Sequence, residues 1–129
     1  MSKYENLLNL TVRDINIYDT DMVTSKNSRR QLVLKDFKTA TPVEVIPTMK
    51  TAAVAVFGFE KISNRRIKKK YTFITELPEG YDGYVVSADY ADACRYLGRD
   101  VSKLYVPWSP IHESEGSRKI VGYLGLLKV

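Results

Sequence analysis

The side chains best suited to binding a ligand surround one short segment, in which a serine precedes a helix-forming run. Ser87 stands directly before ADYADACRYLG, so it would begin a helix whose first N–H groups and partial positive charge can bind phosphate or carboxylate. Arg95 and Arg99 add guanidinium groups, which bind phosphate through paired hydrogen bonds and stack on bases. Tyr84 and Trp108 are aromatic side chains able to hold a base. These five residues predict a site for an anionic small molecule such as a nucleotide.

Each of these side chains also has a purely structural interpretation, and the sequence leaves both open. Ser87 can serve only as the helix N-cap, a position that serine favours. Arg95 can pair with Asp92 three residues earlier, while Arg99 can pair with Asp100 or with a remote carboxylate. The tryptophan can fold back as a lid on the core.

A second group of charged residues lies in the segment NRRIKKK at 64–70. A Ser-Asn pair between two β-forming runs predicts a turn, so this segment would form the tip and one strand of a long hairpin. Because side chains alternate along a strand, the packed face would contain Ile67, Lys69, Tyr71 and Phe73. The positive side would be a nucleic-acid or partner surface made of Arg65, Arg66, Lys68 and Lys70. The alternative is a solvated sheet edge, which lysines protect against pairing with other chains.

Signals for catalysis or metal binding are missing from the sequence. Cys94 is the only cysteine and His112 the only histidine, which excludes an intrachain disulfide and a Cys/His zinc cluster. Cys94 falls on the apolar stripe of the expected helix, so we expect it to be buried. His112 lies in a polar segment without a positioned nucleophile, and no phosphate-binding loop or hydrolase motif occurs. We therefore expect a protein that is not an enzyme and that uses no cofactor.

Length and composition favour a single soluble domain over residues 1–129. Hydrophobic residues make up 44% of the chain and charged residues 27%, as in globular proteins with one core. The longest apolar run, 52–59, is much shorter than the roughly 20 residues that span a bilayer, and residues 1–10 lack the apolar core of a signal peptide. We therefore expect a cytoplasmic protein with no membrane association. The net charge of +5 points to anionic partners.

Most of the chain has the alternating pattern of β-strands. Strands are expected at 14–18, 31–37, 42–46, 50–59, 67–75, 84–86, 104–107 and 119–128. The helix is expected at 88–97 and would end at Gly98, a residue that tolerates the left-handed conformation. Segments 22–30 and 108–117 show neither the alternation of a strand nor the hydrophobic spacing of a helix, and they are expected to be loops. This order predicts a compact α+β fold, a mostly antiparallel β-sheet with one main helix near 88–97.

Four segments taken together resemble a family of small proteins encoded by tailed bacteriophages and prophages. They are NLTVRDINIYD at 9–19, PTMKTAAVAV at 47–56, LPEGYDGYVVSADYADACRYLGRDVSKLYVP at 77–107 and KIVGYLGL at 119–126. The family pattern has Asn-Leu-Thr, Tyr-Ile-Val-Ser, Arg-x-Asp and Val-Pro in this order, and the resemblance spans the chain. Val12 and Arg13 stand where the family usually has Pro-His, so a role of that histidine is not expected here.

The resemblance implies a phage or prophage origin, and small accessory phage proteins commonly antagonise host defence. We therefore expect a counter-defence binding protein that sequesters a host signalling nucleotide, of the cyclic or ADP-ribose type, without catalysis. One alternative is a protein-binding inhibitor of a nucleic-acid-handling host defence complex, similar to an anti-CRISPR protein. Another is a basic accessory protein that binds nucleic acid weakly. A homo-oligomer is compatible with each of these functions.

Overall fold

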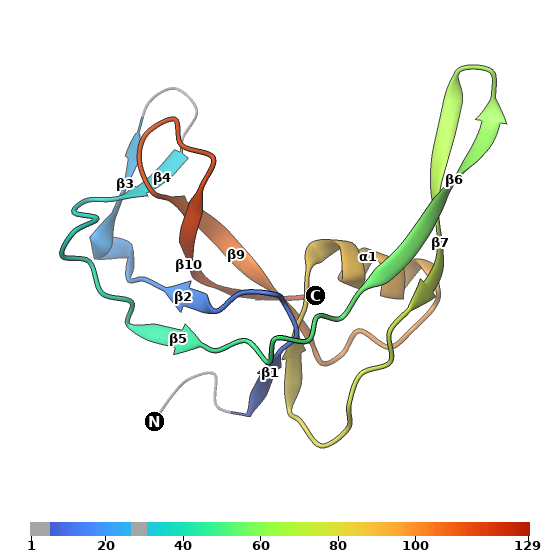
Figure 1. Ribbon diagram of the computed structural model, residues 1–129, viewed down its shortest axis with the longest axis horizontal. Coiled ribbons are helices and arrows are strands. Elements are labelled where there is room, and N and C mark those ends of the chain that lie inside the picture. Colours follow the sequence, from blue (N-terminus) through green and yellow to red (C-terminus); the bar gives the residue numbers. More distant parts are fainter. Residues whose placement is uncertain (1–5, 27–30) are drawn as a thin grey trace.

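A mixed β-sheet forms the body of the protein, and one helix and a separate hairpin lie beside it (Figure 1). The computed structural model describes residues 6–26 and 31–129. The strands of the sheet are β1 (Leu7–Asn9), β2 (Ile15–Ile17), β3 (Val23–Lys26), β4 (Gln31–Leu34), β5 (Glu44–Ile46), β8 (Gly83–Val85), β9 (Leu104–His112) and β10 (Ile120–Lys128). The hairpin consists of β6 (Ala55–Ser63) and β7 (Arg66–Ile74), the helix is α1 (Ala88–Tyr96), and a 3₁₀ turn, η1, spans Thr20–Met22. The predicted α+β class is confirmed.

The sheet is mixed, so the expectation of a mostly antiparallel sheet is wrong. Its strand order is β1-β8-β9-β10-β2-β5. In addition, β4 pairs with the far end of β9, and β3 pairs with β4. Four pairs are parallel, namely β1 with β8, β8 with β9, β10 with β2 and β4 with β9. The connection through α1 makes β8 and β9 parallel, since a strand that returns by a helical crossover joins its neighbour in parallel. The other three parallel pairs join strands that are far apart in the sequence. A bridge between Asn9 and Thr48 brings the chain after β5 back to β1, which nearly closes the sheet into a barrel.

The described residues form three buried clusters, and the largest of them lies between this sheet, α1 and the foot of the hairpin. The helix buries Tyr90, Ala91, Ala93 and Cys94, against Leu104 of β9 and the residues around them. Cys94 is 2% exposed, which confirms the expected burial, and desolvation raises the pKa of its thiol. A thiol in that state is a poor nucleophile at neutral pH, so its role is packing.

Both predicted ends of α1 are confirmed. Ser87 Oγ accepts a hydrogen bond from Tyr90 N at 3.1 Å, as a serine N-cap does. At the other end Gly98 has φ +70°, and Arg99 N donates to Cys94 O at 2.8 Å. A residue in the left-handed region is required there to turn the chain out of the helix.

Two segments expected to be loops contain strands. β9 continues through Trp108 to His112, and its Pro107 and Pro110 oppose Leu126 and Tyr123 of β10. Within 22–30, residues Val23–Lys26 form β3, and residues 27–30 lie outside the described part of the chain. Both segments have poor local signals and are held extended by strand pairing: β3 pairs with β4, and the second half of β9 pairs with β10 and β4.

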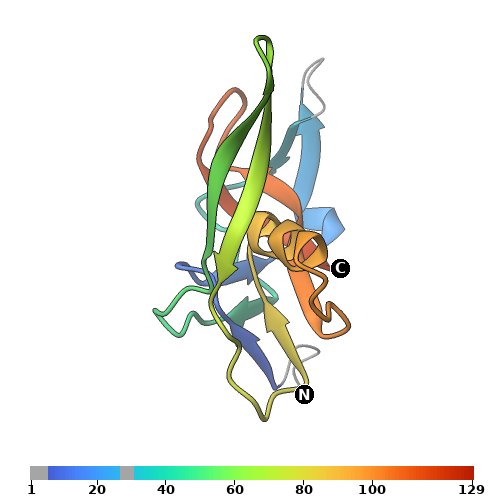
Figure 2. The ribbon, with the colours of Figure 1, turned by 90° about the vertical axis from the view of Figure 1, so that its right-hand side faces the viewer.

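The predicted hairpin is confirmed and stands out from the body beyond α1 (Figures 1 and 2). Its face assignment is wrong at one position. Val56 pairs with Phe73 while the next residue, Phe57, pairs with Tyr71, so a bulge puts Phe73 and Tyr71 on opposite faces. Ile67 shares the face of Tyr71 as expected, but it is 70% exposed and does not pack.

Candidate functional site: a cationic cleft

The five residues predicted to bind a ligand do not come together. Ser87 precedes α1 and Arg99 follows it, and a helix of nine residues is about 13 Å long. Arg99 instead pairs with Glu76, through Nη2 and Oε1 at 2.8 Å, which raises the pKa of its guanidinium further above the ordinary value. Tyr84 is buried at 6% exposure, and its hydroxyl donates to the carbonyl of Pro78.

The remaining two residues of that set also lie apart. Arg95 Nη1 is 3.5 Å from Asp92 Oδ1, so the ion pair considered as its structural alternative is formed. Trp108 is half exposed on β9, opposite Gly125 of β10, rather than in a loop. Of the five side chains, Ser87 is the one that borders the cationic cleft described next.

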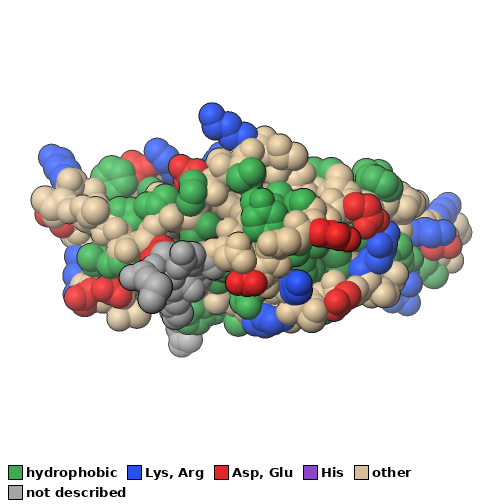
Figure 3. Space-filling model, turned by 90° about the horizontal axis from the view of Figure 1, so that it is seen from below, with side chains coloured by type: hydrophobic (Ala, Val, Ile, Leu, Met, Phe, Trp, Pro, Cys, Tyr) green, Lys and Arg blue, Asp and Glu red, His purple; other side chains and the backbone are tan. Residues whose placement is uncertain are grey.

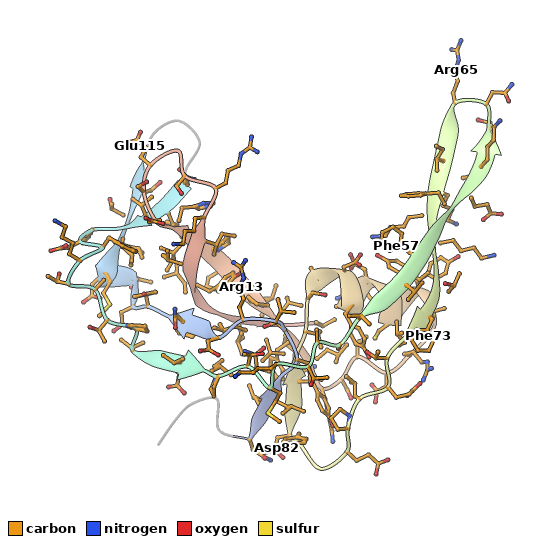
Figure 4. The ribbon with its side chains drawn as sticks, viewed as in Figure 1. Arg13, Phe57, Arg65, Phe73, Asp82 and Glu115 are labelled. Atoms are coloured by element: carbon orange, nitrogen blue, oxygen red, sulfur yellow. The ribbon has the colours of Figure 1, made fainter. Side chains whose placement is uncertain are left out.

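A cleft of about 770 Å³ opens between the N-terminus of α1, the turn before β2 and the start of β10. Basic side chains enter it from two segments far apart in the sequence: Arg13 before β2, and Arg118 with Lys119 before β10. Arg13 projects from the body on the side that also carries the hairpin (Figure 4). Apolar lining comes from Val106, Pro107, Ile120, Val121 and Tyr123. The lining of the cleft thus combines charged groups with apolar residues, as in many small-molecule sites.

A buried amide fixes the turn that presents Arg13. Asn9 is 1% exposed, and its Nδ2 donates to Ile46 O at 2.9 Å and to Arg13 O at 3.0 Å. Its Oδ1 accepts from both Thr11 N, at 2.9 Å, and Thr11 Oγ1, at 2.6 Å. One side chain therefore ties the end of β1 to β5 and to the turn, which holds the Arg13 backbone in place.

The electrostatic balance of the cleft is positive. Arg13 and Arg118 are exposed, and neither takes part in the ion pairs found among the described residues. The charge of Lys119 is partly neutralised by Glu113, whose Oε2 lies 3.3 Å from Lys119 Nζ. One acid lines the cleft, Asp14, and its Oδ1 accepts the N–H of Thr48 at 2.8 Å. Two arginines thus remain available for an anion.

The helix N-terminus adds backbone donors to these cations. Ser87 O and Oγ accept from Ala91 N and Tyr90 N, which leaves the N–H groups of Ala88 and Asp89 without intrahelical partners. The carboxylate of Asp89 turns to the hairpin instead, where Lys69 Nζ lies 2.5 Å away and the Tyr71 hydroxyl donates at 2.7 Å. These bonds lower the pKa of Asp89 and compensate its charge, which reduces its repulsion of an anion at the helix end.

Other surfaces are less suited to an anion. A second cavity, of about 540 Å³, is lined by apolar residues such as Leu10, Met49 and Phe73, and Glu76 is its charged lining residue. Seen from below, acidic and basic side chains are interspersed with apolar ones (Figure 3). The predicted basic surface is elsewhere: Arg65 is at the hairpin tip (Figure 4), and Arg66, Lys68 and Lys70 are exposed along β7.

Sequence reasoning missed the cations of the cleft. In the sequence, Arg13 stands out only as a departure from the Pro-His pair of the expected family pattern, and not as a ligand residue. Arg118 and Lys119 had no signal, because only the parallel pairing of Tyr123 with Ile17 brings their segment beside Arg13.

The structure offers no further chemistry at the cleft. Among the described residues, no group of three or more His, Cys, Asp and Glu side chains could hold a metal ion, and no helix is long and apolar enough to cross a membrane. His112 lies in β9 rather than in a solvated loop, and its Nδ1 donates to Ser117 O at 2.8 Å. Comparisons with known protein families, curated proteins and solved structures find no match to this chain. The geometry of the cleft therefore has to carry the functional argument.

Proposed function

We propose that the protein is a phage counter-defence protein that sequesters a signalling nucleotide of the host, of the cyclic or ADP-ribose type, in the host cytoplasm. The nucleotide occupies the cationic cleft and leaves it chemically unchanged. The phage part of this proposal rests on the sequence resemblance, and the ligand class rests on the cleft. The observation that carries it is the convergence of Arg13 and Arg118 on a cavity bordered by the N-terminus of α1.

The dimensions and lining of the cleft support a phosphorylated ligand of this class. Its volume lies within the roughly 300–1,000 Å³ of typical small-molecule sites. Two guanidinium groups can each bind a phosphate in a bidentate manner, and the free N–H groups of Ala88 and Asp89 suit a third anionic oxygen. Tyr123 and the neighbouring apolar residues offer a surface for a base.

Calorimetry with a panel of cyclic dinucleotides and cyclic ADP-ribose isomers tests the proposal. We expect one ligand with a submicromolar dissociation constant that is recovered intact after the protein is denatured by heat. Arg13→Ala should weaken its binding by about 1.5–3 kcal/mol, because a charge-assisted hydrogen bond is lost.

Arg99→Ala is the matched control. It removes the same charge at the other end of α1, where the arginine pairs with Glu76, and it should leave the affinity unchanged. A panel without any binding, or equal losses in both variants, would refute the cleft as a nucleotide site. Recovery of a degraded ligand would instead show that the protein is an enzyme.

A further inference from the structure

The β6–β7 hairpin lies outside the cleft and exposes side chains that its own fold does not use. Its two strands pair only with each other, and its foot rests on α1 through Tyr71, whose ring centroid is 5.7 Å from that of Tyr96. The hairpin exposes large apolar side chains along its length. They are Val56, Phe57, Phe59, Ile62, Ile67 and Phe73. Exposed apolar groups at this density mark an interaction surface.

Positive charge is also concentrated on the hairpin. Between residues 55 and 74 the only acidic residue is Glu60, against six basic ones: Lys61, Arg65, Arg66, Lys68, Lys69 and Lys70. Arg66, Lys68 and Lys70 oppose Ser63, Glu60 and Gly58, so the three share one face at two-residue spacing. Lys69 is held by Asp89, while the ion pairs found among the described residues leave the cations of that face free.

Aromatic side chains form a row on the other face. Phe57 and Phe59 alternate along β6 with their ring centroids 5.7 Å apart, and Lys61 continues the same row. Phe59 is 71% exposed. The hairpin is only two strands wide, so an extended ligand can pass around its edge and contact both the rings and the cations of the opposite face.

We propose that the hairpin binds single-stranded nucleic acid, with bases stacked on Phe59 and phosphates held by Arg66, Lys68 and Lys70. Stacked bases cover exposed rings and phosphates neutralise the cations, so one ligand accounts for both features. A second copy of this chain would bring two positive hairpins together and is disfavoured by charge. A duplex would contact the cations but leave the aromatic row in water. The inference is independent of the nucleotide cleft.

Fluorescence anisotropy with a labelled single-stranded oligothymidylate, measured between about 50 and 200 mM salt, tests this inference. We expect binding that weakens steeply with salt. Replacing Arg66, Lys68 and Lys70 together by Ser should reduce the slope of log K against log salt by about 2, since each single-strand phosphate contact contributes about 0.7. Replacing Lys35, Lys38 and Lys103 by Ser is the matched control, because it removes the same charge away from the hairpin.

Phe59→Ala separates stacking from charge. It should weaken binding about ten-fold while leaving the salt slope unchanged, because stacking on a ring is independent of counterion release. Each variant alters exposed side chains, and a thermal melt followed by circular dichroism should confirm an unchanged fold.

Three results would overturn the inference. They are no binding at low salt, equal affinity for a duplex of the same length, and an unaltered affinity of the folded Phe59→Ala variant. The first would leave an acidic protein surface as the partner that fits the hairpin.

Discussion

The body and the hairpin contain the same kinds of apolar side chain but place them in opposite environments. In the body, Leu104 and Ile111 of β9 are at most 1% exposed, whereas Phe59 and Ile67 of the hairpin are about 70% exposed. A sheet that curls around a core can bury one face, but two strands alone cannot. The buried apolar residues therefore stabilise the fold, whereas the exposed ones along the hairpin do not.

The hairpin is attached to the body at its foot, where Tyr71 and Ile74 of β7 join the buried core around α1. Its foot combines the Tyr71 ring, the Lys69–Asp89 ion pair and the Lys69 ammonium 4.0 Å from the centre of the Phe57 ring. The Lys69 and Asp89 side chains are about 40% exposed, and ion pairs of that exposure contribute little to stability. The body should thus contribute most of the stability of the protein, and the exposed part of the hairpin little of it.

The largest expected effect is the loss of stability when a buried side chain of the body is truncated, compared with the same truncation of an exposed side chain of the hairpin. Ile111→Ala should lower the free energy of unfolding by about 2–5 kcal/mol, because it leaves a cavity in a fully buried site. Phe59→Ala should change it by no more than about 0.5 kcal/mol. Urea unfolding of both variants measures the two values. Similar losses would mean that the hairpin belongs to the cooperative core.

A middle-sized effect concerns the ends of α1, which connects the two regions. Ser87→Ala should cost about 1 kcal/mol through loss of the cap to Tyr90 N. Gly98→Val should cost about 1–2 kcal/mol, because a β-branched residue resists φ +70° although open space surrounds the position. Denaturant melts give both numbers, and Ser102→Ala, outside the helix, serves as the control. Unchanged midpoints would contradict the helix boundaries.

The smallest effect is the pH response of the hairpin foot. Hydrogen bonds from Lys69 and then Tyr71 lower the pKa of Asp89 below 3.8, so its stabilising contribution is complete above that pH and is lost as the carboxylate protonates in acid. Lys69→Met should raise the Asp89 pKa towards its ordinary value, while Lys68→Met, on the other face, should not. NMR titration of the Asp89 carboxyl carbon measures the shift. Equal pKa values in all three proteins would exclude the foot as described.

Local patterns predict the parts of the fold that depend on neighbours in sequence. The helix ends follow from Ser87 and Gly98, and the hairpin follows from two β-forming runs around a turn. Most of the parallel pairs could not be predicted, since they depend on strands that only the complete fold brings together. The second half of β9 was missed because Pro107 and Pro110 give it a poor local strand signal. The bulge beside Val56 likewise depends on the pairing of the two strands, and it moved Phe73 to the other face.

The site was less predictable than the fold for a related reason. Ser87 does border the cleft, because a helix cap is a local feature. Arg99 was expected beside it, but Gly98 ends the helix and sends that arginine to Glu76 at the opposite end. Arg13 and Arg118 approach one another only through the β2–β10 pairing, for which a single sequence contains no signal.

That same pairing links folding to the time course of synthesis. β2 can pair with β5 early, but it meets β10 only after the ribosome has added Tyr123, which comes about 5–20 seconds after Ile17 at ordinary elongation rates. A hairpin such as β6–β7 can close within about 1–10 microseconds once its own residues have emerged. During that interval the nascent chain can present its aromatic and basic hairpin while Ile15 and Ile17 still lack the part of their cover that β10 supplies. A partner that meets the hairpin at the ribosome would therefore bind before the body exists.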